Sequence, residues 1–316
     1  MGRGYVLQRV LVAVVQVLLL AVLVFLLTEA LPGDAATVRF GEQTTLEEVE
    51  RLRERLELDR PAWERFADWL GGVLTGDLGT SLVSGGPVGD ALARAFPVTL
   101  VLTAVTLVLV VPLAVLLGVV AGLREGGRLD RALTSITLAL QSIPDFVLAT
   151  LLVALLAVRL RLLPATAIGA DAADLLSRPE LLVLPVVVLL ARVTGLLSRQ
   201  VRAGVVDAAR SEYVAQARRL GLPRRTVVLR HVLPNAAVPA VQELARVGDG
   251  LLGGVLVVEA VFAVPGVATE VVEAVQARDV PVVQSFVLLL GALALVVNLG
   301  ADLLANRLVP RAEVLR

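Results

Sequence analysis

Long apolar runs decide what this chain can fold into. The first one, Val10 to Leu27, contains a single polar residue, Gln16. A helix needs about 20 such residues to cross about 30 Å of hydrocarbon, and each Leu, Val or Phe favours insertion by about 0.3 to 0.6 kcal/mol. The run therefore predicts a retained membrane helix. A cleaved signal peptide, the alternative given Arg3 and Arg9, would have a shorter apolar core of about 7 to 15 residues.

Five further apolar runs follow in a chain of 316 residues that is 57% hydrophobic and 18% charged. We expect these spans at Val98 to Leu123, Ala132 to Val158, Leu181 to Leu197, Ala236 to Phe262 and Val282 to Ala305. The expected fold class is therefore an all-α integral membrane protein with about six transmembrane helices. An even number of spans places both chain ends on one side of the membrane.

Glycines within two of these runs favour close helix packing. The pattern Gly118-x-x-x-Gly122 is typical of membrane helices in near contact. The span that ends at Phe262 carries three charges in its first half and a glycine cluster, Gly248, Gly250, Gly253 and Gly254. A simple reduction of side-chain bulk is the other interpretation of either glycine pattern.

The distribution of Arg indicates the orientation, because the chain contains no Lys. The segment from Arg199 to His231 contains eight Arg and only two acidic residues, and three more Arg lie between Arg124 and Arg131. Short loops rich in basic residues stay on the cytoplasmic side. The segment from Leu31 to Pro97 holds twelve acidic residues against seven Arg, which suits export. We therefore predict that both termini are cytoplasmic (N-in, C-in).

The exported segment is patterned for helices. Thr45 and Glu48 form a capping box, and apolar residues then recur at helical spacing at Leu46, Val49, Leu52 and Leu56. Pro61 can begin a second helix, whose aromatic and apolar residues are Trp63, Phe66, Trp69, Leu70 and Val73. We predict a helical hairpin on the outer membrane face, where it packs against the bundle or contacts a partner.

The residue types that are missing exclude several kinds of chemistry. Without Cys there is no disulfide and no thiolate metal site, and a single His excludes a zinc site of the His-Glu-x-x-His type. The phosphate-binding loop Gly-x-x-x-x-Gly-Lys-Ser/Thr requires a Lys. We therefore expect no catalytic residue, no metal site and no cofactor in this chain, and no enzyme activity of its own.

The segment from Arg199 to His231, which we call the Arg-rich loop, has the features of a docking element. One face of its expected helix holds Val206, Tyr213, Ala217 and Leu220. Gly221 would end this helix, and Pro223 would begin another turn. A slim helix with an Arg-rich face can enter a groove of a soluble partner, or it can lie on anionic lipid. The pattern alone leaves both interpretations open.

Polar groups within or beside the spans support an alternative function. Ionisable groups inside a membrane are costly and often functional. Asp145, which follows Pro144 at an expected helix break, either lines a translocation path or caps the resumed helix. Glu259 and Asn298 either contact a solute or form hydrogen bonds between helices. The alternative is an ion-gradient-driven secondary transporter or channel, but the inverted repeats of many secondary transporters are not seen in the sequence.

The Arg-rich loop resembles the EAA loop of ABC importer permeases. That pattern is Glu-Ala-Ala, three residues, Gly, nine residues and Ile-x-Leu-Pro. Counting from Gly221 places Ala215, Gln216 and Ala217 at the first three positions and His231 to Pro234 at the last four. Ala215 replaces the Glu and His231 replaces the Ile. The loop is similar to that of the permease branch that imports dipeptides, oligopeptides and nickel. The similar positions are Tyr213-Val214, Ala217-Arg218, Gly221-Leu222 and Arg230-His231.

Further segments resemble signatures of the same branch over nearly the whole chain. They are Leu31-Pro32-Gly33-Asp34, Gly76 to Ser81, Pro97 to Leu100, Val258 to Phe262 with Pro265-Gly266, Ala277-Arg278-Asp279 with Pro281 to Gln284, and Val297 to Leu299 with Asp302. Each is weak alone, but their common order and spacing are specific. Val309-Pro310-Arg311 departs from the Asp-Pro-Arg usual in this branch.

The resemblance implies a multi-pass permease subunit of a type I ABC importer in a bacterial or archaeal cell membrane. Its parts would be residues 1–31 with the first span, an extracytoplasmic segment 32–96, and a core permease domain 97–316 with a cytoplasmic coupling loop 199–235. The implied cargo is a peptide or a related small solute such as a nickel chelate. The residues implied to couple this chain to the ATPase are Tyr213, Ala215, Ala217, Arg218, Gly221, Leu222 and Arg225.

The same resemblance implies several partners. These are a second homologous permease, two ATP-binding subunits that hold the ATP and Mg, an extracytoplasmic solute-binding protein and membrane lipid. No nucleic acid is expected among them.

Overall fold

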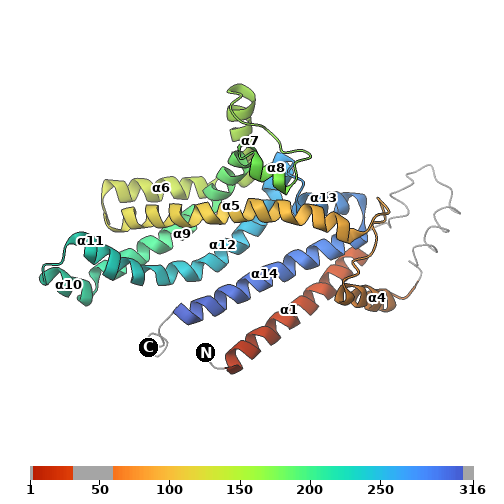
Figure 1. Ribbon diagram of the computed structural model, residues 1–316, viewed down its shortest axis with the longest axis horizontal. Coiled ribbons are helices and arrows are strands. Elements are labelled where there is room, and N and C mark those ends of the chain that lie inside the picture. The colour runs from red at the N-terminus through yellow and green to blue at the C-terminus, as the bar shows by residue number, and fades with distance from the viewer. Residues whose placement is uncertain (1–2, 31–59, 309–316) are drawn as a thin grey trace.

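The computed structural model describes residues 3–30 and 60–308, and the regular elements of this part of the chain are all helical. They are α1 (Arg3–Glu29), α4 (Ala62–Thr75), α5 (Val88–Gly122), α6 (Arg128–Ser142), α7 (Asp145–Leu152), η2 (Val153–Arg159), α8 (Ala172–Ser177), α9 (Glu180–Arg210), α10 (Glu212–Arg219), α11 (Arg224–Val227), η3 (Val228–Val232), α12 (Leu233–Phe262), α13 (Val267–Ala277) and α14 (Val280–Leu308). The long helices form an elongated bundle, with α10 and α11 at one end and α4 and α13 near the other (Figure 1).

Four of these helices, α1, α5, α9 and α14, are long and apolar enough to cross a membrane. Two bent pairs also qualify if each is counted as one span: α6 with α7 and η2, and the end of α12 with α13. The described residues thus contain four to six candidate spans, in agreement with an all-α membrane fold.

The expected continuous span from Ala132 to Val158 is wrong. The chain bends by 97° between α6 and the helix that starts at Asp145. Ile143 is extended, with φ −80° and ψ 126°, and Pro144 is the N-cap of α7. A residue before proline is pushed out of the helical region by the proline ring, so this local sequence breaks the helix even though the run stays apolar.

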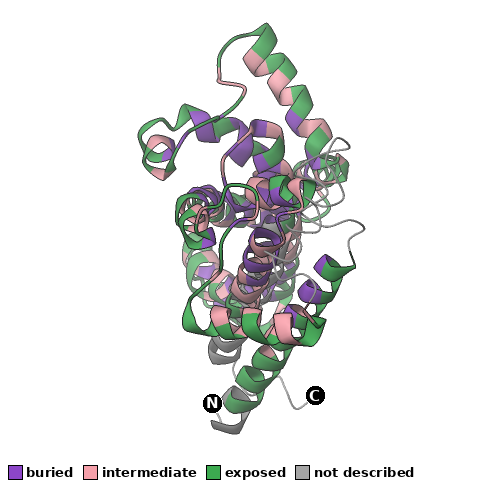
Figure 2. Ribbon diagram, turned by 90° about the vertical axis from the view of Figure 1, so that its right-hand side faces the viewer, coloured by how far each residue is buried: buried purple, intermediate pink, exposed green. Residues whose placement is uncertain are grey.

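Helix α9 is the centre of the bundle. In its most apolar stretch 67% of residues are buried, against 17% in α1 and 22% in α5, and buried residues gather along the middle of the molecule (Figure 2). Glycines bring its neighbours close. A Cβ on Gly118 would lie 2.6 Å from the Ser198 carbonyl oxygen, and one on Gly122 would lie 2.8 Å from Val205. The close-packing interpretation of this pattern is therefore confirmed.

Helix α4 is held to α1 by an aromatic cluster. Phe25 packs edge to face on Phe66 with ring centroids 5.2 Å apart, and the ring of Trp69 lies 6.2 Å from that of Phe25. Trp63, placed in the packing stripe from the sequence, is instead 70% exposed. The expected capping box at Thr45 and the helix after it lie outside the described residues.

The close contact between α5 and α9 predicts a sharp difference between two glycines of one helix. Gly118→Ala should destabilise the protein by about 1 to 3 kcal/mol, because overpacking forces the two backbones apart. Gly89→Ala is the matched control, since no atom lies within 4 Å of its Cβ position. Thermal unfolding in detergent measures both, and equal stability of the two variants would contradict the packing account.

Candidate functional site

The Arg-rich segment is a short helix joined to the central helix by one residue. Helix α9 continues to Arg210, Ser211 is extended, and α10 begins at Glu212. The expected coupling loop 199–235 therefore starts later, because its first twelve residues belong to α9. Val206 and Tyr213 consequently lie on different helices, and the expectation that they share one helical face is wrong.

Helix α10 turns its small residues inward and its large ones outward. Val214 is fully buried and Ala217 is 5% exposed, both within the main core. Tyr213 is 45% exposed and Leu220 is 71% exposed. Ala217 thus packs on this chain's own core, which corrects the expectation that it sits on the docking face. Of the other coupling residues, Ala215 is half-buried, while Arg218, Leu222 and Arg225 are exposed.

Gly221 ends α10 in the expected way. Its φ is +76°, in the left-handed region. Its N–H donates to the Arg218 carbonyl at 3.0 Å, and the Leu222 N–H donates to the Ala217 carbonyl at 3.3 Å. These two bonds form a Schellman motif, which satisfies the last free carbonyls of a helix. The predicted glycine cap is confirmed.

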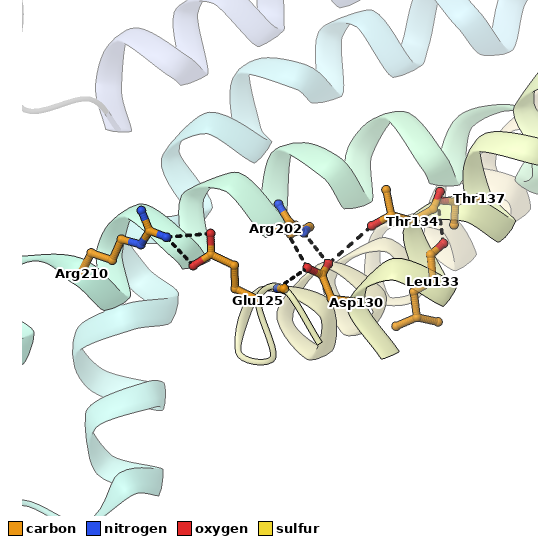
Figure 3. A network of polar contacts seen from close by, with 8 residues as sticks. Glu125, Asp130, Leu133, Thr134, Thr137, Arg202 and Arg210 are labelled. Carbon is orange, nitrogen blue, oxygen red and sulfur yellow. Dashed lines mark hydrogen bonds and ion pairs between the residues drawn. The ribbon is translucent and has the colours of Figure 1, made fainter. Parts of the chain in front are cut away.

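Two ion pairs tie the last third of α9 to the first turn of α6 and to the turn that precedes it (Figure 3). Arg202 donates to both carboxylate oxygens of Asp130, at 2.6 and 2.7 Å, and the Gly126 N–H donates to the same group at 2.9 Å. Arg210 donates to both oxygens of Glu125 at 2.9 and 2.8 Å. The partners are 72 and 85 residues apart, so local patterning could not reveal them.

Asp145 is paired with a residue that the sequence did not single out. The Arg192 Nη1 donates to Asp145 Oδ2 at 2.6 Å, and the Asp145 side chain is 8% exposed against 42% for Arg192. The carboxylate makes no capping bond to α7, so the capping interpretation is wrong. Gly254 leaves room for the pair, since a Cβ there would lie 3.2 Å from Arg192 Cδ.

Glu259 joins three helices. It is fully buried, and its two carboxylate oxygens accept from the Thr99 hydroxyl at 2.6 Å and the Ala268 N–H at 2.8 Å. The Val267 N–H donates to Thr99 at 2.8 Å. Side chains of α12 and α5 thus cap the start of α13, whose own N-cap is Gly266. The interhelical interpretation of Glu259 is confirmed, while Asn298 lies half-buried on α14.

Two of the segments that resemble family signatures, Gly76 to Ser81 and Ala277 to Asp279, meet at the end of the bundle opposite α10 (Figure 1), whereas Leu31 to Asp34 lies outside the described residues. The Asp279 carboxylate accepts from the Ser81 hydroxyl and from the Leu82 N–H, the latter at 3.0 Å. Gln284 donates to Thr28 of α1 at 2.8 Å. These bonds tie the loop between α4 and α5 and the first helix to the start of α14. The signature residues Ser81, Asp279 and Gln284 therefore join distant parts of the chain.

Comparison with known proteins now decides the family. Residues 114–314 match the family described as binding-protein-dependent transport system inner membrane component, and residues 2–103 match its N-terminal counterpart. The chain belongs to this family. It is a multi-pass inner-membrane protein and an ABC transporter permease.

Relatives match the permease over nearly its full length. A Brucella melitensis protein, provisionally named a peptide transport system permease, is 34% identical over 313 residues, covering 99% of each chain. The glutathione transport system permease GsiC of Escherichia coli K12 is 35% identical over 301 residues, covering 95% of this chain and 96% of its own. Both names describe transport permeases.

The pairing of Asp145 with Arg192 leads to a test by single and double substitution. Arg192→Leu should lower stability by about 3 kcal/mol, because it strands a buried carboxylate. The double variant Asp145→Asn/Arg192→Gln removes both charges and should recover most of this loss. Thermal unfolding in detergent would reveal the difference, and a double variant less stable than Arg192→Leu would argue against the ion pair.

Proposed function

We propose that this permease is one of two membrane subunits of an ATP-driven importer of peptides, with glutathione-like peptides included and nickel chelates as the remaining cargo class. The supporting observation is the near-complete match to permeases named for peptide and glutathione transport. The proposed assembly contains a second homologous permease, two ATP-binding subunits that bind ATP and Mg, and a solute-binding protein outside.

The proposed topology is N-in, C-in with α10 and α11 in the cytoplasm. The start of α1 and the end of α14 lie toward the α10 end of the bundle (Figure 1), and this end carries the Arg-rich loops favoured on the cytoplasmic side. The segment 32–96 then lies outside, so that the joined signature segments around Asp279 face the solute-binding protein.

The proposed contact with an ATPase is the outer face of α10. The helix exposes Tyr213 and Arg218, and the large apolar side chains of Leu220 and Leu222 are exposed directly after it. Such a short helix can enter a groove on a soluble subunit. Val214 and Ala217 are buried and pack α10 against the core of this permease. A force applied to α10 is therefore passed to the core.

Ion pairs provide a route for this force into the membrane. Ser211 alone separates α10 from α9, and α9 is tied to α6 through Asp130 and to the α5–α6 turn through Glu125. Closure of the ATPase pair would therefore move α9, α5 and α6 together as a rigid-body transition. This arrangement supports coupling through the short cytoplasmic helix.

The best candidate for the translocation path is the pair of Asp145 and Arg192. Its Arg is 42% exposed although it lies well within α9, and ionisable groups there mark transport pathways in many membrane proteins. A half-exposed guanidinium can bind a peptide carboxylate bidentately. Glu259, with both oxygens occupied, is better assigned to positioning α13, and Asn298 stays a prediction.

The cap of α10 predicts a backbone effect on coupling. Gly221→Val should reduce recovery of the ATPase subunits with the permease, because a side chain in the left-handed region costs about 1 to 2 kcal/mol. Gly221→Asn, which tolerates this conformation, should retain them. No atom lies within 4 Å of the Cβ position, so sterics do not interfere. Equal recovery and equal transport for both variants would refute the role of this cap.

The absence of Lys predicts that the purified permease neither binds nor hydrolyses ATP, whereas the full assembly does both. Uptake of radiolabelled dipeptide into vesicles should require the ATPase subunits and internal ATP. Vesicles holding only the permease, energised with a proton or sodium gradient, serve as the control. Gradient-driven uptake by these vesicles would establish the alternative, a secondary transporter.

A further inference from the structure

A basic hollow lies where α5 ends beside α11. Its volume is about 550 Å³, and its charged lining consists of Arg124, Arg224 and Arg225. Its apolar lining includes Val120, Leu123 and Leu229. We call this space the Arg hollow. The mixture of guanidinium groups and aliphatic side chains fits a ligand that is itself both anionic and apolar.

The described part of the chain supplies no ion pair to the Arg residues of the Arg hollow. Within the described ranges, no ion pair involves Arg124, Arg224 or Arg225, and all three side chains are exposed. Glu125 lines an adjoining hollow together with Arg124 and Arg224, but it already holds Arg210 at 2.8 Å. Among the described residues, the three guanidinium groups thus share one space without an ion pair to a carboxylate.

An apolar stripe leads from the membrane part of α5 into this hollow. Leu109, Leu113 and Leu116 are 44%, 36% and 60% exposed. Residues three and four apart lie on one helical face, so the stripe continues to Val120 and Leu123, which line the hollow. A soluble partner cannot cover a stripe within a membrane span, whereas a lipid acyl chain or the proposed second permease can.

We propose that the Arg hollow binds the headgroup of an anionic phospholipid whose acyl chain lies along the stripe of α5. Basic pockets at the membrane edge bind anionic headgroups, and guanidinium groups bind phosphate oxygens in pairs. The two interpretations of the Arg-rich loop thus apply to different places: the outer face of α10 suits a protein, and the Arg hollow suits lipid. The proposal goes beyond peptide transport and does not depend on the cargo.

The test uses a tryptophan reporter in the full-length permease. Both native Trp residues lie in α4, so the background Trp63→Phe/Trp69→Phe leaves Val120→Trp as the sole indole. Brominated phosphatidylglycerol in mixed micelles should quench it at a much lower mole fraction than brominated phosphatidylcholine. Mass spectrometry of lipid retained by the unmodified permease gives a second measurement that does not depend on the reporter.

Charge variants locate the headgroup. Arg224→Gln/Arg225→Gln should weaken phosphatidylglycerol binding about 30-fold, from the typical attraction per basic residue near a lipid surface. Arg219→Gln/Arg230→Gln removes the same charge from the same segment outside the hollow and should weaken binding less than threefold. Equal losses in the two variants, or equal binding of both lipids, would overturn the proposal.

Two further measurements distinguish lipid binding in the Arg hollow from the binding of a free anion and from contact with the ATPase. Glycerol phosphate carries the same headgroup chemistry without acyl chains and should not compete at equal concentration, whereas full competition would make this a free-anion site. Addition of the ATPase subunits should leave the bound lipid in place. Its release would assign the hollow to the ATPase contact and overturn the lipid proposal.

Discussion

Close packing around α9 is the constraint on which the rest of the structure depends. Gly118 and Gly122 let α5 approach α9 on one side, and on the other a Cβ at Gly204 would lie 2.7 Å from the Ala236 carbonyl of α12. In a bilayer the hydrophobic effect does not draw helices together, so small residues and close contact must supply the attraction. Because α9 is held from both sides, a displacement of the end that joins α10 is passed to its neighbours.

The sequence predicted the parts of this fold that depend on local chemistry. Run length predicted α1, α5, α9 and α14, and Gly221 predicted the end of α10, because apolar length and left-handed backbone are properties of a few adjacent residues. The predicted end of α9 at Leu197 is wrong, because a contact between distant helices decides where this helix ends. Its polar last turns look like loop in a hydropathy pattern, yet they remain helical because Val201 and Val205 pack on α5.

The candidate site depends on contacts that no local pattern contains. Asp145 was singled out as a charged residue after a proline, but its partner Arg192 is 47 residues away. The spacing of Val206 and Tyr213 predicts one shared face only if α9 and α10 form a single helix, and they do not. A single extended residue, Ser211, resets the helical phase, and a pattern of spaced residues cannot detect such a change.

The two helix breaks use their carboxylates differently. Glu259 accepts from two elements while Thr99 caps α13, and Gly266 is required because a Cβ there would lie 2.2 Å from the carboxylate. Separating these helices would leave several buried polar groups unpaired at once, which is costly. Asp145 has one strong contact, to an Arg already half exposed. The break at Pro144 is therefore held by fewer side-chain bonds than the break before α13, because its carboxylate bonds only to Arg192 among the described residues.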